Sequence, residues 1–258
     1  MAGNLRNRPG VHNLSDAEVS AFRDAYAKMQ AITDNRGFTY FAGLHGDPNY
    51  FCQHTTDVNA PAYLFLPWHR AYLYNFELAM RSQVPTATLP WWDWTLRPPR
   101  QDGIPKIFAA KTVAGGKANP LYSYRIDADN PPVHHQTTRQ PQPVDQLPTE
   151  SKVKTVSDTG DWGEFSLNIE VQLHNAVHGW VGGDMGIVAY AAFDPIFYSH
   201  HCNIDRLWWL WQVRNGNGSM PDSLLDQVLV PWTLTVRDVL SVNSLGYDYA
   251  AAQAIIPI

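Results

Sequence analysis

Six of the ten histidines in this 258-residue chain form two triplets that lie far apart in the sequence. The two triplets are His45, His54 and His69, and His174, His178 and His201. Neutral imidazole is a ligand for copper, zinc, iron and nickel, whereas magnesium and calcium prefer oxygen ligands. Two triplets of imidazole, with neither carboxylate nor thiolate among them, indicate a pair of borderline-soft metal ions held close together. The fold must therefore bring two distant parts of the chain to one site.

Four segments carry the apolar spacing of amphipathic helices. Ser15 and Glu18 form a capping box before an apolar stripe, which predicts a helix over residues 15–31. The three other helices carry histidines of the triplets. They are expected to begin near Pro67, to cover about 166–179, and to run from Asp194-Pro195 to about Val213.

The stretch 96–160 separates the triplets and is rich in proline, threonine, glutamine and charge. Such a stretch inside one domain is usually a functional excursion or a mobile loop. It is not a linker between domains, because the two halves of the metal site lie on either side of it. We therefore expect a single domain over residues 1–258 that is mainly α. Its core would be a four-helix bundle carrying the metal site, with long irregular loops.

Composition argues against several classes of partner. The formal net charge is -5 and no dense basic run is present, which argues against nucleic acid and anionic membranes. No apolar run approaches the length of a membrane span. The amino terminus lacks the apolar region of a secretory signal, as in a cytoplasmic protein or a mature secreted form. The two cysteines, Cys52 and Cys202, are too few for a disulfide framework.

The HNAVH sequence at 174–178 is a weak signal by itself, because two histidines on one helical face also arise by chance. Asn175 stands where the zinc-protease motif HExxH has its catalytic glutamate, which excludes that reading. The Glu-x-x-His pairs of di-iron bundles are also missing. Two copper ions that bind dioxygen between them are the best match. Of the other histidines, His12, His134 and His135 are expected to be exposed. His200 is expected to support the neighbouring ligands or to be structural, and not to be a ligand itself.

The chain contains the motifs FLPWHRAYLYNFE, LPWWDWT, HNAVHGWVGGDM and DPIFYSHHCNIDRLW. With Arg8 near the start and Tyr247 to Tyr249 near the end, these motifs resemble those of the type-3 copper family. That family comprises tyrosinases, catechol oxidases (polyphenol oxidases) and molluscan-type haemocyanin units. The resemblance covers nearly the whole chain except 96–160. It implies two copper ions as cofactors, one bound by His45, His54 and His69 and the other by His174, His178 and His201.

The first triplet departs from the family in one respect. His54 and His69 are fifteen residues apart, more than is usual in the family, so we interpret HTTDVNAPAY as a local insertion. Cys52 precedes His54 with the Cys-x-His spacing of members in which the cysteine sulfur is bonded to the ligand ring. The resemblance therefore implies a thioether between Cys52 and His54.

The resemblance also implies an activity. With O2 as co-substrate, the protein would hydroxylate monophenols to catechols, as a monooxygenase, and oxidise o-diphenols to o-quinones. Glu170 and Asn175 would hold a water that deprotonates the phenol. Val188, Phe197 and Gly179 would form the substrate pocket, with valine leaving room for a ring to enter. Small phenols are the expected partners, and a protein that delivers copper would be a further one.

Three alternatives remain open at the level of sequence. The first is a catechol oxidase without activity on monophenols. The second is a haemocyanin-like oxygen carrier, which needs its site shielded from phenols by a further domain; the chain ends at Ile258, soon after the tyrosine motif, which favours the enzyme. The third is a structural bundle that is metal-free or binds zinc.

Overall fold

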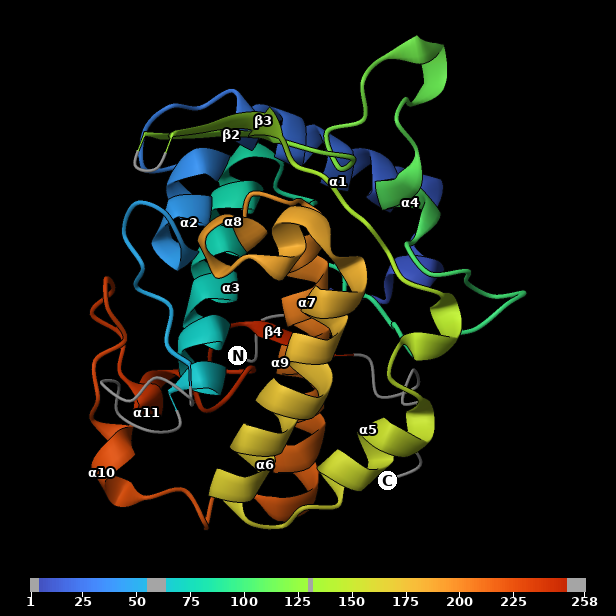
Figure 1. The fold of residues 1–258 in the computed structure, drawn as a ribbon. Helices are drawn as coiled ribbons and strands as arrows, with labels where there is room; N and C mark the ends of the chain where they lie inside the picture. Colours follow the sequence, from blue (N-terminus) through green and yellow to red (C-terminus); the bar gives the residue numbers. More distant parts are fainter. Residues whose placement is uncertain (1–4, 55–63, 130–131, 250–258) are drawn as a thin grey trace.

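The computed structural model describes residues 5–54, 64–129 and 132–249. This part of the chain is mainly helical, with two small two-stranded sheets (Figure 1). The mainly α fold expected from the sequence is therefore confirmed. The helices around the histidines are α2 (Phe38–His45), α3 (Phe65–Gln83), α6 (Trp162–Ile169), α7 (Asn175–Val181) and α9 (Ile196–Asn215).

The first predicted helix is confirmed as α1 (Asp16–Gln30), within one residue at each end. Ser15 Oγ accepts a hydrogen bond from the backbone N–H of Glu18 (3.3 Å), and the Glu18 carboxylate accepts one from the backbone N–H of Ser15 (2.8 Å). This pair is the predicted capping box. The helix α1 packs on α2 and α3 and contributes no triplet histidine. The helix α1 therefore packs against helices that carry triplet histidines but supplies no ligand itself.

The fourth ligand-bearing member of the bundle is α2, a helix that the sequence reasoning missed. Its amino-terminal residue follows Gly37, which provides no side-chain cap. The helix has no polar face long enough to produce an amphipathic pattern, because most of it is buried. Its buried residues are Phe38, Phe41, Ala42, Gly43, Leu44 and His45. Burial on nearly all sides hides the helical period from the sequence.

The predicted helix over 166–179 is part of a longer helical run that contains a π-helical turn. The run begins with α6, continues through the π-helical turn Glu170–His174 and ends with α7. The backbone N–H of Asn175 bonds to the carbonyl oxygen of Glu170, five residues earlier. Turns of this kind occur often at functional sites, and here one ends at a histidine of the second triplet.

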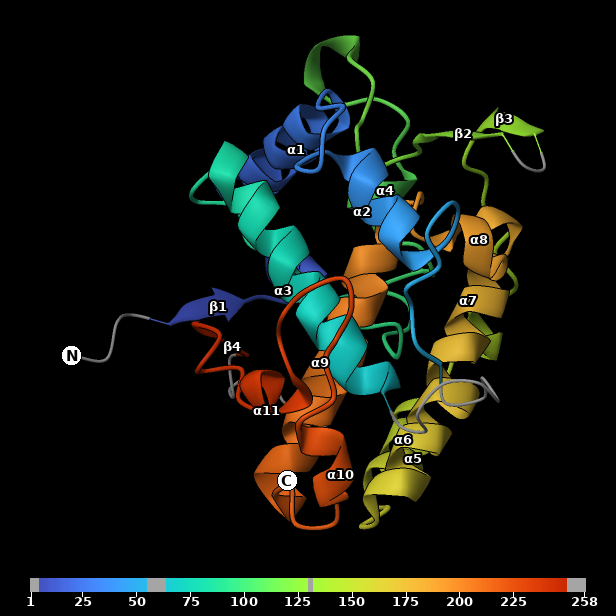
Figure 2. The same ribbon diagram turned by 90° about the vertical axis from the view of Figure 1, so that its left-hand side faces the viewer.

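The helices α3 and α9 pack against each other through the centre of the molecule (Figure 2). The helix α3 begins at Phe65, two residues before the predicted start. Pro195 occupies the N-cap position of α9, and the Asp194 carboxylate accepts a hydrogen bond from the backbone N–H of Ile196 (3.1 Å). The predicted Asp-Pro start of this helix is therefore confirmed, shifted by one residue.

The stretch 96–160 contains short elements that pack on the helical core. Phe108, Leu121, Ile126 and Val153 are fully or almost fully buried there. Their burial explains why the stretch has a fixed place despite its polar composition. The elements are α4 (Lys106–Ala109), the antiparallel hairpin of β2 (Arg125–Asp129) and β3 (Pro132–Gln136), and α5 (Glu150–Ser157). The remaining short helices of the described chain are α8 (Val188–Ala191), α10 (Asp222–Leu225) and α11 (Val236–Val239).

The two ends of the described chain meet in a small parallel sheet of β1 (Arg6–Arg8) and β4 (Tyr247–Tyr249). The buried Arg8 guanidinium donates to Glu77 of α3 (2.9 Å) and to Asp205 of α9 (3.2 Å). The Tyr249 hydroxyl also donates to Asp205 (2.6 Å). This buried network ties the sheet to the two central helices. No helix within the described ranges is both long and apolar enough to cross a membrane.

Candidate metal centre

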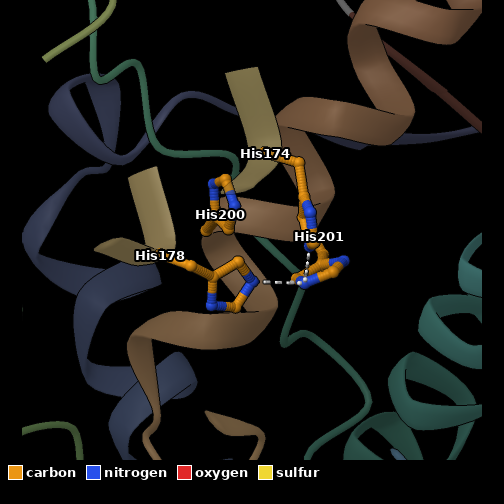
Figure 3. Close-up of side chains that lie close together, drawn as sticks. All are labelled: His174, His178, His200 and His201. Carbon is orange, nitrogen blue, oxygen red and sulfur yellow. Dashed lines mark hydrogen bonds between the residues drawn. The ribbon is translucent and has the colours of Figure 1, made fainter. Parts of the chain in front are cut away.

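The second histidine triplet lies where α7 approaches α9. His174 ends the π-helical turn, His178 lies one turn further along α7, and His201 lies in α9 (Figure 3). The Nε2 atom of His201 is 3.2 Å from Nε2 of His174 and 3.1 Å from Nε2 of His178. The structure thus brings all three predicted imidazoles together, with the same ring atom of each at the centre.

The hydrogen bonds of the Nδ1 atoms fix which nitrogen of each ring carries a proton. His178 Nδ1 donates to the carbonyl oxygen of Met185 (2.7 Å), and His174 Nδ1 donates to Oδ1 of Asn175 (2.9 Å). Both rings therefore direct an Nε2 lone pair at Nε2 of His201. One proton cannot satisfy these facing atoms, whereas a metal ion can. Two imidazole nitrogens bound about 2.0–2.1 Å from one ion lie roughly 3 Å apart, as they do here.

His200 also lies in this cluster, beside the ligand rings. Its ring stacks on that of His174 with centroids 5.4 Å apart, and it is fully buried. Each of the four histidines His174, His178, His200 and His201 has a ring nitrogen that lies within 4.8 Å of a ring nitrogen of each of the other three. The dashed contacts in Figure 3 nevertheless join His201 to His174 and His178, and none is drawn to His200.

The first triplet is assembled from three different parts of the chain. His45 is the last residue of α2, His69 lies in the first turns of α3, and His54 lies in the loop between them. His69 Nδ1 donates to the carbonyl oxygen of Phe65 (2.8 Å). Within the described chain, the buried Nε2 atoms of all three histidines have no hydrogen-bond partner. Buried polar atoms without a partner are costly, and a bound metal ion would remove that cost.

His54 is supported by side chains instead of by a helix. Its Nδ1 atom lies 3.1 Å from Oε1 of Glu170, whose side chain is fully buried. Burial alone would lower the pKa of His54, but hydrogen bonds with Cys52 and Glu170 outweigh it and raise the pKa to about 9. The predicted insertion after His54 includes residues 55–63, which lie outside the described residues.

The other triplet histidines have pKa values below the usual range. Burial, the largest cause, lowers the pKa of His178 to about 4. Burial and the neighbouring imidazoles also lower the pKa values of His45, His69, His174 and His201. These rings are therefore neutral at physiological pH, which is the state in which imidazole binds a metal ion.

The two triplets face each other and form one cluster. The rings of His69 and His201 are stacked, with centroids 4.5 Å apart and planes inclined by 20°. His45 and His201 have centroids 6.0 Å apart. The Phe197 ring fills the space beside this contact, stacking on His201 at 4.0 Å and meeting His45 edge-on at 4.7 Å. Two metal ions held by these triplets would therefore be close neighbours.

A cavity of about 330 Å³ opens from the cluster to the surface. Its walls include four of the triplet histidines and small or apolar residues. Val188 stands at its mouth and is 50% exposed, and Gly179 is also exposed on the wall. The lining residues are His45, His54, His174, Asn175, His178, Gly179, Met185, Gly186, Val188 and Ala191. Phe197, predicted for the same pocket, is fully buried against the imidazoles.

Glu170 and Asn175 each contact a different histidine ring. The Glu170 carboxylate is within hydrogen-bond distance of the His54 ring in the first triplet, and Oδ1 of Asn175 accepts a hydrogen bond from the His174 ring in the second. Of these two residues, only Asn175 is exposed on the cavity wall, because Glu170 is fully buried. Their contacts support the orientation of the two rings, and their joint action on a water stays a prediction.

Comparison with known proteins identifies the family. Residues 35–214 match the family model described as the common central domain of tyrosinase. The chain belongs to the tyrosinase family of type-3 copper proteins. This range contains all six triplet histidines, so the matched region includes the whole histidine cluster.

Relatives within the tyrosinase family include both oxygen carriers and enzymes by name. Hemocyanin units G and H of Sepia officinalis are 30% identical over 236 residues, which are 83% of this chain and 39% of that protein. The structure of an octopus hemocyanin functional unit is similar with a TM-score of 0.79 at 28% identity, covering 95% of this chain and 68% of the other. A tyrosinase from Burkholderia thailandensis shares the fold, with a TM-score of 0.83 at 22% identity over 96% and 75% of the two chains.

The donor set of this tyrosinase-family chain fits a pair of copper ions. Imidazole nitrogens are suitable ligands for copper, and among the described residues the two groups of Nε2 atoms have no other partners that could satisfy them. Sequence reasoning missed the carbonyl groups of Met185 and Phe65, which orient His178 and His69. A backbone carbonyl has no signature in the sequence. The glycine pair at 182–183 after α7 was the available sign of a sharp turn there.

Proposed function

We propose that this chain is a type-3 copper phenol oxidase that acts on monophenols and o-diphenols. The open cavity is the observation that supports an enzyme. It leads from the surface to imidazoles of both triplets, and its volume lies in the range of sites for small molecules. Apolar residues such as Val188 and Ala191 line it beside the polar Asn175. These walls suit an aromatic ring that carries a hydroxyl group.

The histidines would hold one copper ion in each triplet through their Nε2 atoms. When bound, the copper pair would supply the binding and activation of O2 and accept electrons from the phenol. The protein keeps the rings in one tautomer through the Nδ1 contacts of His69, His174 and His178. Burial keeps the other five rings, those of His45, His69, His174, His178 and His201, in the neutral form that binds a metal ion.

A monophenol needs more help from the protein than a catechol does, because it must lose its proton as it binds. Asn175 on the cavity wall and the carboxylate of Glu170 near His54 are the groups we assign to this step. Together they would hold a water that accepts the phenol proton. With both copper sites kept saturated, Asn175→Ala or Glu170→Gln should then reduce monophenol hydroxylation more than catechol oxidation. An equal reduction would show that both residues only support the copper ligands.

Reversible oxygen binding is the second candidate. The hemocyanin relatives at 30% and 28% identity favour it, and the ligand set would be the same. The chain spans 39% of the cuttlefish protein, so the properties of that whole protein do not transfer directly. A carrier requires that phenols be kept from the metal ions, whereas the cavity formed by the described residues is open.

Oxygen uptake separates these functions. The copper-loaded chain is mixed with a catechol and, separately, with a monophenol, and His201→Ala serves as the inactive control. We expect O2 consumption with both, and a faster rate with the catechol. Consumption with catechol alone would identify a catechol oxidase. Reversible O2 binding without turnover of either phenol would contradict the proposal and favour a carrier.

A further inference from the structure

Part of the stretch 96–160 binds the turn that follows α7. This anchoring segment, residues 135–140, consists of the last two residues of β3 and the four residues after them. Figure 2 shows the β2–β3 hairpin on the same side of the molecule as α7 and α8. The backbone N–H of Gln140 donates to the carbonyl oxygen of Val181 (2.8 Å). The backbone N–H of Asp184 donates to the carbonyl oxygen of Thr138 (3.1 Å). The turn is thus attached along its length to the anchoring segment.

The close approach of these segments requires glycine. Gly183 has a φ of +56°, in the left-handed region that other residues rarely adopt. A Cβ atom at this position would also lie 2.2 Å from the carbonyl oxygen of Thr138. Both facts show that the backbone of the turn is shaped to fit against Thr138.

Asp184 adds a side-chain attachment at the same place. Its carboxylate is almost fully buried, and Oδ2 accepts hydrogen bonds from the backbone N–H (2.7 Å) and Oγ1 (3.0 Å) of Thr138. Oδ1 lies 2.9 Å from Nε2 of His135. A buried carboxylate with three such contacts is held firmly, and so is the backbone to which it belongs.

The next residue along the chain contacts the metal site. The carbonyl oxygen of Met185 accepts the hydrogen bond from Nδ1 of His178, a ligand-bearing ring of the second triplet. This bond selects the tautomer in which the Nε2 lone pair faces His201. The position of the carbonyl depends on the turn, and the turn is fixed by Asp184.

We propose that Asp184 is a positioning residue that fixes His178 for metal binding through the carbonyl group of Met185. The anchoring segment, which contributes no metal ligand, would thereby control the second triplet. The inference rests on the proposed function in so far as His178 binds copper. Its structural part, the control of the His178 ring by Asp184, can be measured without copper.

The same hairpin offers a matched control. Asp127 and His134 form a second carboxylate–imidazole pair at 3.0 Å, and both side chains are about half exposed. Within the described residues, neither member of this pair has a hydrogen bond to the turn after α7. Asp127→Ala therefore removes a similar interaction from the hairpin and leaves the turn intact.

The test uses the metal-free full chain and nitrogen NMR of the His178 ring. In the wild type and in Asp127→Ala, His178 should be in the Nδ1-protonated tautomer. In Asp184→Ala, the ring should populate both tautomers. Thr138→Val removes one of the three contacts and keeps the side-chain shape, so it should produce a smaller shift in the same direction. Unchanged His178 signals in folded Asp184→Ala, or equal changes in Asp127→Ala, would overturn the proposal.

A copper titration in competition with a chelator provides the second readout. Loss of a group that orients a metal-binding histidine typically weakens metal binding by about 10–100-fold. Asp184→Ala should show that loss for one of two ions, while the other ion binds as in the wild type. If the wild type bound no copper, the proposed function would fail while the tautomer measurement still decided the role of Asp184. If Asp184→Ala bound both ions like the wild type, Asp184 would have no positioning role toward copper.

Discussion

The two histidine triplets contain equal numbers of imidazoles but are built in different ways. All three rings of the second triplet come from helical segments, and their centroids are 4.4 to 5.3 Å apart. In the first triplet, His54 comes from a loop, and the centroids are 5.6 to 6.1 Å apart. In the second triplet, the regular geometry of the helical backbone sets the positions of the three rings. The loop histidine depends on Glu170 and Cys52, so side-chain interactions replace the missing helix.

The largest effect is expected when a ligand ring is removed. Replacing His45, His69, His174, His178 or His201 with alanine should reduce catechol oxidation to background, because each ion requires its three imidazoles and O2 activation requires both ions. His54→Ala should behave in the same way despite its loop position. Copper content and turnover are measured together, with His134→Ala on the exposed hairpin as the control. A ligand variant with two coppers per chain and normal turnover would refute the assignment of that residue.

A smaller and selective effect is expected from Glu170→Gln. The substitution removes the negative charge beside His54 and leaves the hydrogen-bonding partners of His174 and His178 in place. The first triplet should bind its ion about 10–100-fold more weakly, and the second should be unchanged. Chelator competition measures both affinities. Equal weakening of the two ions would mean that the triplets are not supported independently.

In the metal-free protein, His54 and His178 should make opposite contributions to the pH dependence of stability. Burial lowers the pKa of His178 to about 4, below the value of about 6.5 for an unfolded histidine. The unfolded chain binds more protons between these values, so this residue makes stability fall as the pH falls from about 6.5 to about 4. His54 has the opposite sign. Its pKa of about 9 makes the folded chain bind more protons, so its stabilising contribution falls as the pH rises from about 6.5 to about 9.

Urea unfolding of the metal-free chain across both pH ranges tests this difference. His178→Gln should reduce the loss of stability on the acid side, and His54→Gln should reduce the loss on the alkaline side. Identical pH profiles for the wild type and the two variants would show that these rings do not titrate as described.

The smallest effect on activity is expected at Cys52. Its ligand atom lies within 4.8 Å of those of His45 and His54, and both cysteines of the chain are free in the described structure. We predict that the copper-loaded chain, with O2 as the oxidant, forms a thioether between Sγ of Cys52 and a ring carbon of His54. The new bond replaces the S–H bond and one ring C–H bond, and O2 takes up the two electrons and two protons. The intact chain is then lighter by two hydrogen atoms. Mass spectrometry measures this change, and Cys52→Ser should lose it while keeping part of the activity. A tryptic peptide with an alkylatable Cys52 would rule the bond out.

Sequence reasoning succeeded where local patterns determine structure. The capping box of Ser15 and Glu18 predicted α1, and Asp194-Pro195 predicted the start of α9. It missed α2, whose burial on most sides removes the helical period. It also missed the π-helical turn Glu170–His174, because Glu170, His174 and His178 recur every four residues as they would on a regular α-helix.

In the candidate site, too, some features could be predicted from local sequence patterns and others depend on the folded chain. The imidazoles could be selected from residue type and spacing, and the structure brings them together. The carbonyl group of Met185, which orients His178, could not be found in this way, because every residue has such a group. The contact of Glu170 with His54 joins residues 116 positions apart, so only the folded chain reveals it.

Anomalous diffraction at the copper edge from crystals of the copper-loaded chain would locate the metal ions themselves. We predict two copper peaks per chain, one among Nε2 of His45, His54 and His69, and the other among Nε2 of His174, His178 and His201. A single peak, or a second ion bound by His200 in place of a member of its triplet, would contradict this prediction.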